Sequence, residues 1–188
     1  MLIREKFAFY HIPRTGGQSI EHLLQFNKQL EHPGWLRLGQ VHAPLHRQPV
    51  IVEDYDIFTN IRNPFDRLVS LYELIKAGGV HFIKFDRNVS FPEFIYDHWG
   101  QKADKHDEYN TQEEHLFIDG ELPENITLIK MEEMNQLWPE VIRYYFGHEG
   151  IKIPHKNSVP HADSMTYYNN DLINFVQKRE DWVMQFYR

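Results

Sequence analysis

The sequence predicts an α/β protein in which helices cover both faces of a mostly parallel central sheet, giving three layers (α/β/α). Two stretches support this, because each reads as a buried strand, a turn and an amphipathic helix: Phe7 to Leu24 and Asp56 to Lys76. Parallel strands are short apolar runs, whereas apolar positions three or four apart indicate a helix. A chain of 188 residues suffices for one domain with a substantial core. We therefore expect a single domain over residues 1–188, with a sheet of about four or five strands.

The first stretch starts with a strand over Phe7 to Ile12, for which residues 2–6 serve as a lead-in, and Pro13 ends it. A helix follows from Gln18, and its apolar face consists of Ile20, Leu23 and Leu24. Gly16 and Gly17 lie in the turn between them, where backbone angles and close approaches are needed that a side chain would forbid.

This turn has the properties of an oxyanion site. It directs backbone N–H groups and the positive end of a helix dipole to the same point as the side chains of Arg14, Thr15 and Ser19. Phosphate is the commonest ligand of such a site. The turn is not a Walker A loop, because its spacing is too short and no Gly-Lys-Ser/Thr follows. On this pattern alone, a plain glycine turn with an incidental arginine is an equally good interpretation.

The second stretch repeats the plan. Ile57 to Ile61 is the expected strand, Arg62 follows its carboxyl end, and Pro64 suits the first turn of a helix that ends at Gly78 and Gly79. Ligands of open α/β sheets bind beyond the carboxyl ends of the strands. Both stretches therefore point to one crevice.

The middle of the chain contains weaker signals. Val41 to Pro44 reads as a brief extended piece, and Gly100 to Tyr109 as a solvent-exposed loop. Two capping boxes, Ser90 with Glu93 and Thr111 with Glu114, mark the starts of helices. Trp99 and Tyr109 are expected to pack in the core, and Asp66 and Arg67 to form a structural pair on a helix surface.

Three elements complete the chain. A strand rich in β-branched residues is expected over Ile126 to Met131. Pro139 starts or kinks a helix over Glu140 to Phe146, and a last helix is expected over Asp171 to Tyr187.

Composition excludes several classes of function. The formal net charge of −7 argues against a broad nucleic-acid-binding surface, and the absence of cysteine excludes disulfides and cysteine chemistry and fits a reducing compartment. No apolar run approaches the ~20 residues of a membrane span, and none has the flanks of a signal peptide. The twelve histidines contain no motif such as HExxH, so no metal is expected.

Two motifs resemble those of a known family. HIPRTGGQS is similar to the 5′-phosphosulfate loop, and RNPFDRLVSLY to the 3′-phosphate motif, of sulfotransferases that use 3′-phosphoadenosine 5′-phosphosulfate (PAPS). Their order resembles that of the family-2 group, which includes carbohydrate and heparan sulfate sulfotransferases. The resemblance implies a P-loop-like sulfotransferase fold, PAPS as co-substrate, and an acceptor hydroxyl on a carbohydrate or other small molecule. Golgi members carry a membrane anchor, and its absence here implies a cytoplasmic location.

The resemblance also implies roles for individual residues. Arg14 would stabilise charge on the bridging oxygen, Arg62 and Ser70 would bind the 3′-phosphate, His42 would be the catalytic base, and Lys156 would contact the nucleotide. The 5′-phosphate would be held by Thr15, Gly16, Gly17, Gln18 and Ser19.

Two positions depart from the family pattern, which usually has lysine at position 14 and often threonine at position 18. Arginine keeps the charge but donates no proton at neutral pH. His46 is the alternative base, and His11 is expected to pack or to orient its neighbours. A catalytically degenerate PAPS- or carbohydrate-binding protein stays open as an alternative, as does a P-loop-type phosphotransferase. The sequence leaves the acceptor and the oligomeric state undetermined.

Overall fold

The structure, a computed structural model, describes residues 1–27, 30, 34–49, 52–79, 86, 88–101, 106–156 and 159–187. The chain forms two compact units. Unit 1 contains Met1–Arg62 and Leu116–Ser158, and unit 2 contains Asn63–His115 and Val159–Arg188. That the two units form a single domain stays a prediction.

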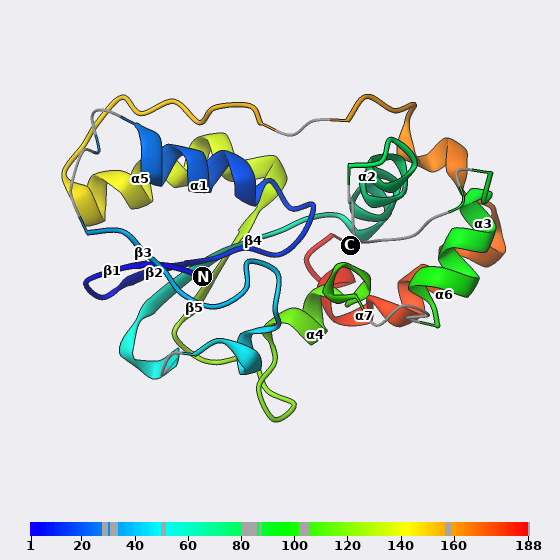
Figure 1. Ribbon diagram of the computed structural model, residues 1–188, viewed down its shortest axis with the longest axis horizontal. Helices are drawn as coiled ribbons and strands as arrows, with labels where there is room; N and C mark the ends of the chain where they lie inside the picture. Colours follow the sequence, from blue (N-terminus) through cyan, green and yellow to red (C-terminus); the bar gives the residue numbers. More distant parts are fainter. Residues whose placement is uncertain are drawn as a thin grey trace. The chain divides into compact units, whose positions relative to one another are not determined.

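Unit 1 contains a five-stranded sheet in the order β3-β1-β2-β4-β5 (Figure 1). Its strands are β1 (Leu2–Arg4), β2 (Phe7–Tyr10), β3 (Leu36–Arg37), β4 (Asp56–Ile61) and β5 (Ile126–Lys130). β4 lies parallel to both β2 and β5, whereas β1 is antiparallel to both β2 and β3. β1 alone therefore runs against the other strands, and the predicted α/β class with a mostly parallel sheet of four or five strands is confirmed.

Sequence analysis missed two of these strands. β1 pairs with β2 in the register Leu2↔Phe9, and the turn between them has a positive φ of 52° at Glu5. β3 has only two residues, both exposed. Strands of two or three residues are too short for a periodic pattern, so their pairing with β2 and with each other decides their structure.

One face of the sheet is covered by α1 (Gly17–Phe26) and α5 (Met134–Phe146), which Figure 1 shows on the same side. Apolar side chains from both helices and from the strands form one core, with Phe7, Phe9, Phe58, Ile20, Leu23, Trp138 and Ile142 among its members. The predicted start of the helix over Glu140 to Phe146 was wrong, because this helix, α5, begins at Met134 and contains Pro139. The buried stripe of Met134, Trp138 and Ile142 recurs every four residues and continues through that position.

The opposite face of the sheet lies against a loop. Because side chains alternate along a strand, Tyr10 points away from the core that contains Phe7 and Phe9, and its hydroxyl donates to the Ala43 carbonyl over 3.0 Å. The expected extended piece over Val41 to Pro44 is instead a turn. The Gln48 side-chain amide bonds both its ends, donating to the carbonyls of Gln40 (3.1 Å) and Ala43 (2.7 Å). The 3₁₀ turns of unit 1 are Leu45–Arg47, Val52–Asp54 and Met131–Glu133.

Unit 2 is built around α2 (Pro64–Lys76), whose N-cap Asn63 accepts a hydrogen bond from the Phe65 N–H. Its further elements are α3 (Phe91–Glu93), a π-helical stretch (Phe94–Trp99), α4 (Gln112–Leu116), α6 (Asn170–Arg179), α7 (Asp181–Met184) and the 3₁₀ turns Asp107–Tyr109 and Ser164–Tyr167. Both predicted capping boxes are present.

The buried core of unit 2 tests two predictions about burial. Trp99 and Tyr109 are fully buried in it, as expected. The predicted solvent loop over Gly100 to Tyr109 is therefore wrong at its end, where Glu108 is also buried. Residues 102–105 of this stretch lie outside the described residues.

A buried ion pair explains the two other errors in unit 2. The predicted last helix over Asp171 to Tyr187 is broken at Glu180, whose buried carboxylate accepts from Arg67 Nη1 and from the Gln112 N–H, both over 3.2 Å. Arg67 is itself buried, and its Nη2 donates to the Asn110 carbonyl over 3.0 Å. The prediction that Arg67 lies on the helix surface was therefore wrong, because the side chain is inside unit 2.

Candidate active site

The loop between β2 and α1 turns sharply at two left-handed residues. Arg14 has φ 67° and Gly16 has φ 82°, and Gly16 is the N-cap of α1. The Thr15 side chain is buried, and its hydroxyl donates to the Ile12 carbonyl over 2.9 Å. A positive φ is costly for arginine, so the loop conformation must be enforced by its surroundings.

Two residues at the end of β4, one inside the strand and one directly after it, form hydrogen bonds that hold the loop. The fully buried Asn60 donates from Nδ2 to the Thr15 carbonyl (3.1 Å) and accepts from Trp138 Nε1 (2.8 Å). Arg62 donates from Nη1 to the Arg14 carbonyl over 3.1 Å. Sequence analysis did not find Asn60, although a polar residue inside a buried strand, two positions before the expected ligand Arg62, was an available signal.

The two glycines of the loop have different roles. Gly16 provides the left-handed turn. A Cβ on Gly17 would collide with the imidazole of His11, because the ring packs directly against the Gly17 Cα. The packing of His11 therefore requires glycine at position 17, whether or not a ligand approaches the backbone there.

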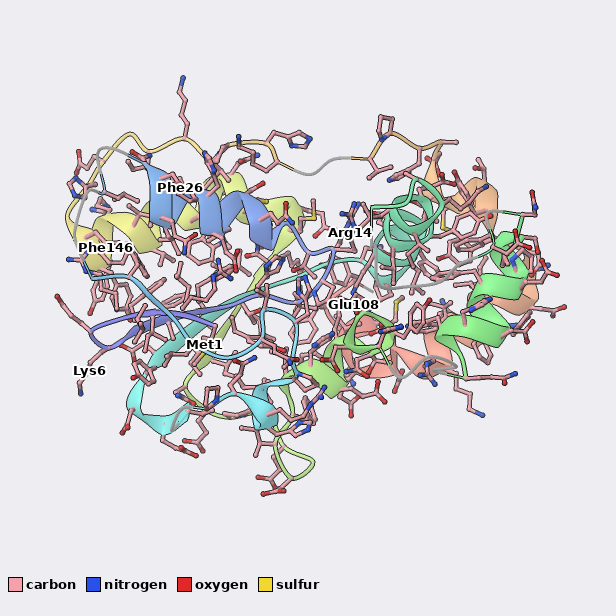
Figure 2. The ribbon with its side chains drawn as sticks, in the orientation of Figure 1. Met1, Lys6, Arg14, Phe26, Glu108 and Phe146 are labelled. Carbon is pink, nitrogen blue, oxygen red and sulfur yellow. The ribbon has the colours of Figure 1, made fainter. Side chains whose placement is uncertain are left out.

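Positive charge concentrates at this loop. Figure 2 labels Arg14 where the chain enters α1. Burial lowers the pKa of the Arg14 guanidinium, and the neighbouring positive charge of Arg62 lowers it further, to about 10. Two guanidinium groups repel each other across a short distance, and an anion between them would relieve that repulsion.

Ser19 and Lys156 meet at the first turn of α1. Ser19 is buried, and its hydroxyl oxygen accepts from the Lys156 N–H over 3.1 Å. A hydroxyl has one donor as well as its acceptor lone pairs, so this bond leaves the Ser19 O–H able to donate to a phosphate oxygen. The side chains of Gln18 and Lys156 are exposed.

The expected base, His42, lies in the same unit as the loop. Its half-buried ring meets the ring of His11 edge-to-face, with centroids 4.8 Å apart and an interplanar angle of 79°. The main chain of the next residue, Ala43, is fixed by Tyr10 and Gln48 as described above. The alternative base, His46, is exposed.

The predicted 3′-phosphate residues fall in different units. Arg62 is the last residue of its segment in unit 1, and Ser70 lies buried on α2 in unit 2. That they bind one phosphate together stays a prediction. Among the described residues, no group of three or more His, Cys, Asp or Glu side chains is arranged to hold a metal ion. None of the described helices has the length and apolar character needed to cross a membrane.

The fold is that of an α/β protein in which the loop carrying Arg14 lies at the carboxyl end of the parallel strands. A family model described as the sulfotransferase family matches residues 2–119, which is more than half of the chain. The chain belongs to this family, and the predicted class, a sulfotransferase, is confirmed.

Solved structures support the fold. The crystal structure of mouse sulfotransferase SULT7A1 complexed with PAP superimposes with a TM-score of 0.62 at 13% sequence identity, covering 97% of this chain and 84% of that one. The predicted sulfotransferase fold is thereby confirmed. A search of curated protein sequences finds no match.

Proposed function

We propose that this protein transfers a sulfuryl group from PAPS to the hydroxyl of a carbohydrate acceptor, with His42 as the base. The observation that supports it most is the meeting of Arg14 and Arg62, from the ends of two parallel strands, at one loop that opens a helix. The similarity to a sulfotransferase complexed with PAP agrees with a nucleotide at this place.

In this proposal, the loop holds the 5′-phosphosulfate. N–H groups at the start of α1 and the hydroxyl of Ser19 donate to its oxygens, and the helix dipole favours its charge. Thr15 contributes its backbone N–H, because its buried hydroxyl already donates to the Ile12 carbonyl, contrary to the expectation that this hydroxyl binds the phosphate. Gly16, Gly17 and Gln18 contribute backbone N–H groups. The side chain of Arg14 stabilises the negative charge that develops on the bridging oxygen as the bond to sulfur breaks.

His42 removes the acceptor's proton. The acceptor oxygen forms a bond to sulfur, the bond between sulfur and the bridging oxygen breaks, and adenosine 3′,5′-bisphosphate (PAP) leaves with the electron pair. An ordinary imidazole has a pKa of about 6.5, so it is available as a neutral base near pH 7.

Three residues are proposed for the rest of the nucleotide. Arg62 and Ser70 bind the 3′-phosphate, and Lys156 adds a contact through its exposed side chain. The bond from Arg62 Nη1 to the Arg14 carbonyl holds the guanidinium beside the loop, so Arg62 would join the two ends of the nucleotide site.

The carbohydrate acceptor and the cytoplasmic location rest on the resemblance of the two motifs to the family-2 group. The test is transfer of radiolabelled sulfuryl from PAPS to a panel of glycans, phenols and amines. We expect labelled glycan and stoichiometric PAP. Labelling of phenols or amines alone would overturn the acceptor class. PAP binding by the wild-type protein with no transfer to any acceptor would favour the degenerate binding protein, which the arginine at position 14 supports.

A further inference from the structure

We propose that Glu21 and His11 are positioning residues for His42. They form a carboxylate–imidazole pair, fixed by Arg37, that sets the orientation and electrostatic surroundings of the His42 ring. This rests on the proposed function, in which His42 is the base, and it assigns to that base a supporting group from α1 and β3.

Glu21 is the charged member of the pair. Its Oε1 lies 3.3 Å from His11 Nδ1, and Arg37 binds both its oxygens, with Nη1 at 3.0 Å from Oε1 and Nη2 at 2.8 Å from Oε2. Burial by itself raises the pKa of Glu21, but the neighbouring side chains of His11 and Arg37 outweigh it and lower the pKa to about 2. The carboxylate is therefore ionised throughout the pH range in which an enzyme works.

His11 is held in one orientation. The ring is buried, packs against the Cα of Gly17, and lies 6.2 Å from the ring of Phe9. Nδ1 lies 3.3 Å from the Glu21 carboxylate without a hydrogen bond of good geometry to it. The packing and this contact therefore fix the position of the His11 ring.

His42 is placed between His11 and an anchored main chain. Its ring contacts His11 edge-to-face on one side, and the carbonyl of the following Ala43 accepts two buried hydrogen bonds on the other. The nearby charges come from Glu21 on α1 and Arg37 on β3, with the Met1 amino group also within electrostatic reach of both. We therefore expect a change of charge at Glu21 to affect His42, because His11 contacts both side chains.

The test is a titration of the histidine rings by NMR in the full chain bound to PAP. Removing a negative charge disfavours the imidazolium, so Glu21→Gln should lower the pKa of His42 by roughly 0.5, less than the shift of about 1 to 3 that direct contact produces. Arg37→Gln leaves the negative charge of Glu21 uncompensated and should raise the pKa of His42. A merely structural role would not produce shifts of opposite sign. Glu140→Gln, on the exposed side of α5, is the matched control and should leave the titration unchanged.

Turnover supplies the second readout, measured as release of PAP from PAPS with water as acceptor. Glu21→Gln should lower kcat by about tenfold, part of the ~10²–10⁴ that a general base contributes, and leave the KM for PAPS unchanged. Thermal unfolding shows whether each variant folds, and if Glu21→Gln does not, Glu21→Asp replaces it in both assays, with smaller effects of the same sign.

If neither Glu21→Gln nor Arg37→Gln moves the His42 titration, the inference is wrong, whatever the turnover shows. If the shifts appear but His42→Ala retains turnover, the electrostatic coupling stands and the proposed base is wrong.

Discussion

The side chain of Arg62 donates a hydrogen bond over 3.1 Å to the carbonyl of Arg14, which lies 48 positions earlier in the chain. The ends of β2 and β4 are joined by this bond, and a second bond, from Asn60 to the Thr15 carbonyl, runs beside it. The conformation of the loop between β2 and α1 therefore depends on Asn60 and Arg62 as well as on the loop's own residues.

Arg62→Ala should distinguish binding of the 3′-phosphate from binding of the 5′-phosphate. If Arg62 binds the 3′-phosphate, loss of a charged hydrogen bond worth about 1.5–3 kcal/mol weakens PAP binding by about 10- to 100-fold more than it weakens binding of adenosine 5′-monophosphate, which lacks that phosphate and reports only the lost bond to the Arg14 carbonyl. Isothermal titration of both nucleotides checks this. Arg62→Lys, which keeps the charge without the planar fork, should fall between the wild type and alanine. Equal weakening of both nucleotides would show that Arg62 acts through the loop and not through the 3′-phosphate.

Asn60→Ala should loosen the loop without removing any proposed ligand contact. The substitution leaves the buried Thr15 carbonyl and the Trp138 N–H without their partner, which costs about 1–3 kcal/mol of unfolding free energy. We expect a lower midpoint in urea and weaker PAP binding. Asn135→Ala, an exposed amide on α5, is the control and should change neither. Unchanged stability in Asn60→Ala would show that the loop holds its shape unaided.

Gly17→Ala tests the packing of His11. Alanine is favoured in a helix, yet its methyl group would collide with the imidazole, and overpacking of this kind costs about 1–3 kcal/mol. A second substitution, His11→Ala, should recover part of the lost stability because it removes the clashing ring. Gly147→Ala meets no neighbouring atom but has φ 70°, so it reports backbone strain alone. If the double variant is no more stable than Gly17→Ala, the clash is not the cause.

Arg67→Met should destabilise unit 2 strongly. It leaves the Glu180 carboxylate buried without its cation, and breaking such a pair costs about 3–5 kcal/mol. The double variant with Glu180→Leu should regain most of this loss, measured by urea unfolding. A double variant as unstable as the single one would show that the pair itself, rather than an uncompensated charge, stabilises the unit.

Glu180 should also make stability depend on pH. Burial raises its pKa to about 7, although Arg67 and the Gln112 N–H act in the opposite direction. A carboxyl with a folded pKa above its ordinary value of 4.5 binds a proton on folding, so its contribution is fully present below pH 4.5 and is lost as the pH rises through about 7. Glu180→Gln should flatten this part of the curve of unfolding free energy against pH. A wild-type curve with no decline in this range would contradict the raised pKa.

The elements that the sequence predicted well are those with local patterns. β2 and α1, like β4 and α2, combine an apolar run with a stripe of helical spacing, and the capping boxes need only four neighbouring residues. The break at Glu180 depends instead on an arginine 113 positions away, and β1 and β3 on pairing in the sheet. The site divides in the same way. Its loop was found from its motif, and Asn60 had a signal as a polar residue in a buried strand, whereas the pair of Glu21 with His11 is visible only once the chain has folded.

The central claim is that His42 is the base beside a PAPS site formed by the Arg14–Ser19 loop. The most direct measurement compares His42→Ala with His46→Ala in sulfuryl transfer from PAPS and, separately, in PAP binding. We expect His42→Ala to lose about 10²- to 10⁴-fold in kcat with an unchanged Kd for PAP, and His46→Ala to keep both. Full turnover in His42→Ala, or loss of turnover only in His46→Ala, would show that His42 is not the base.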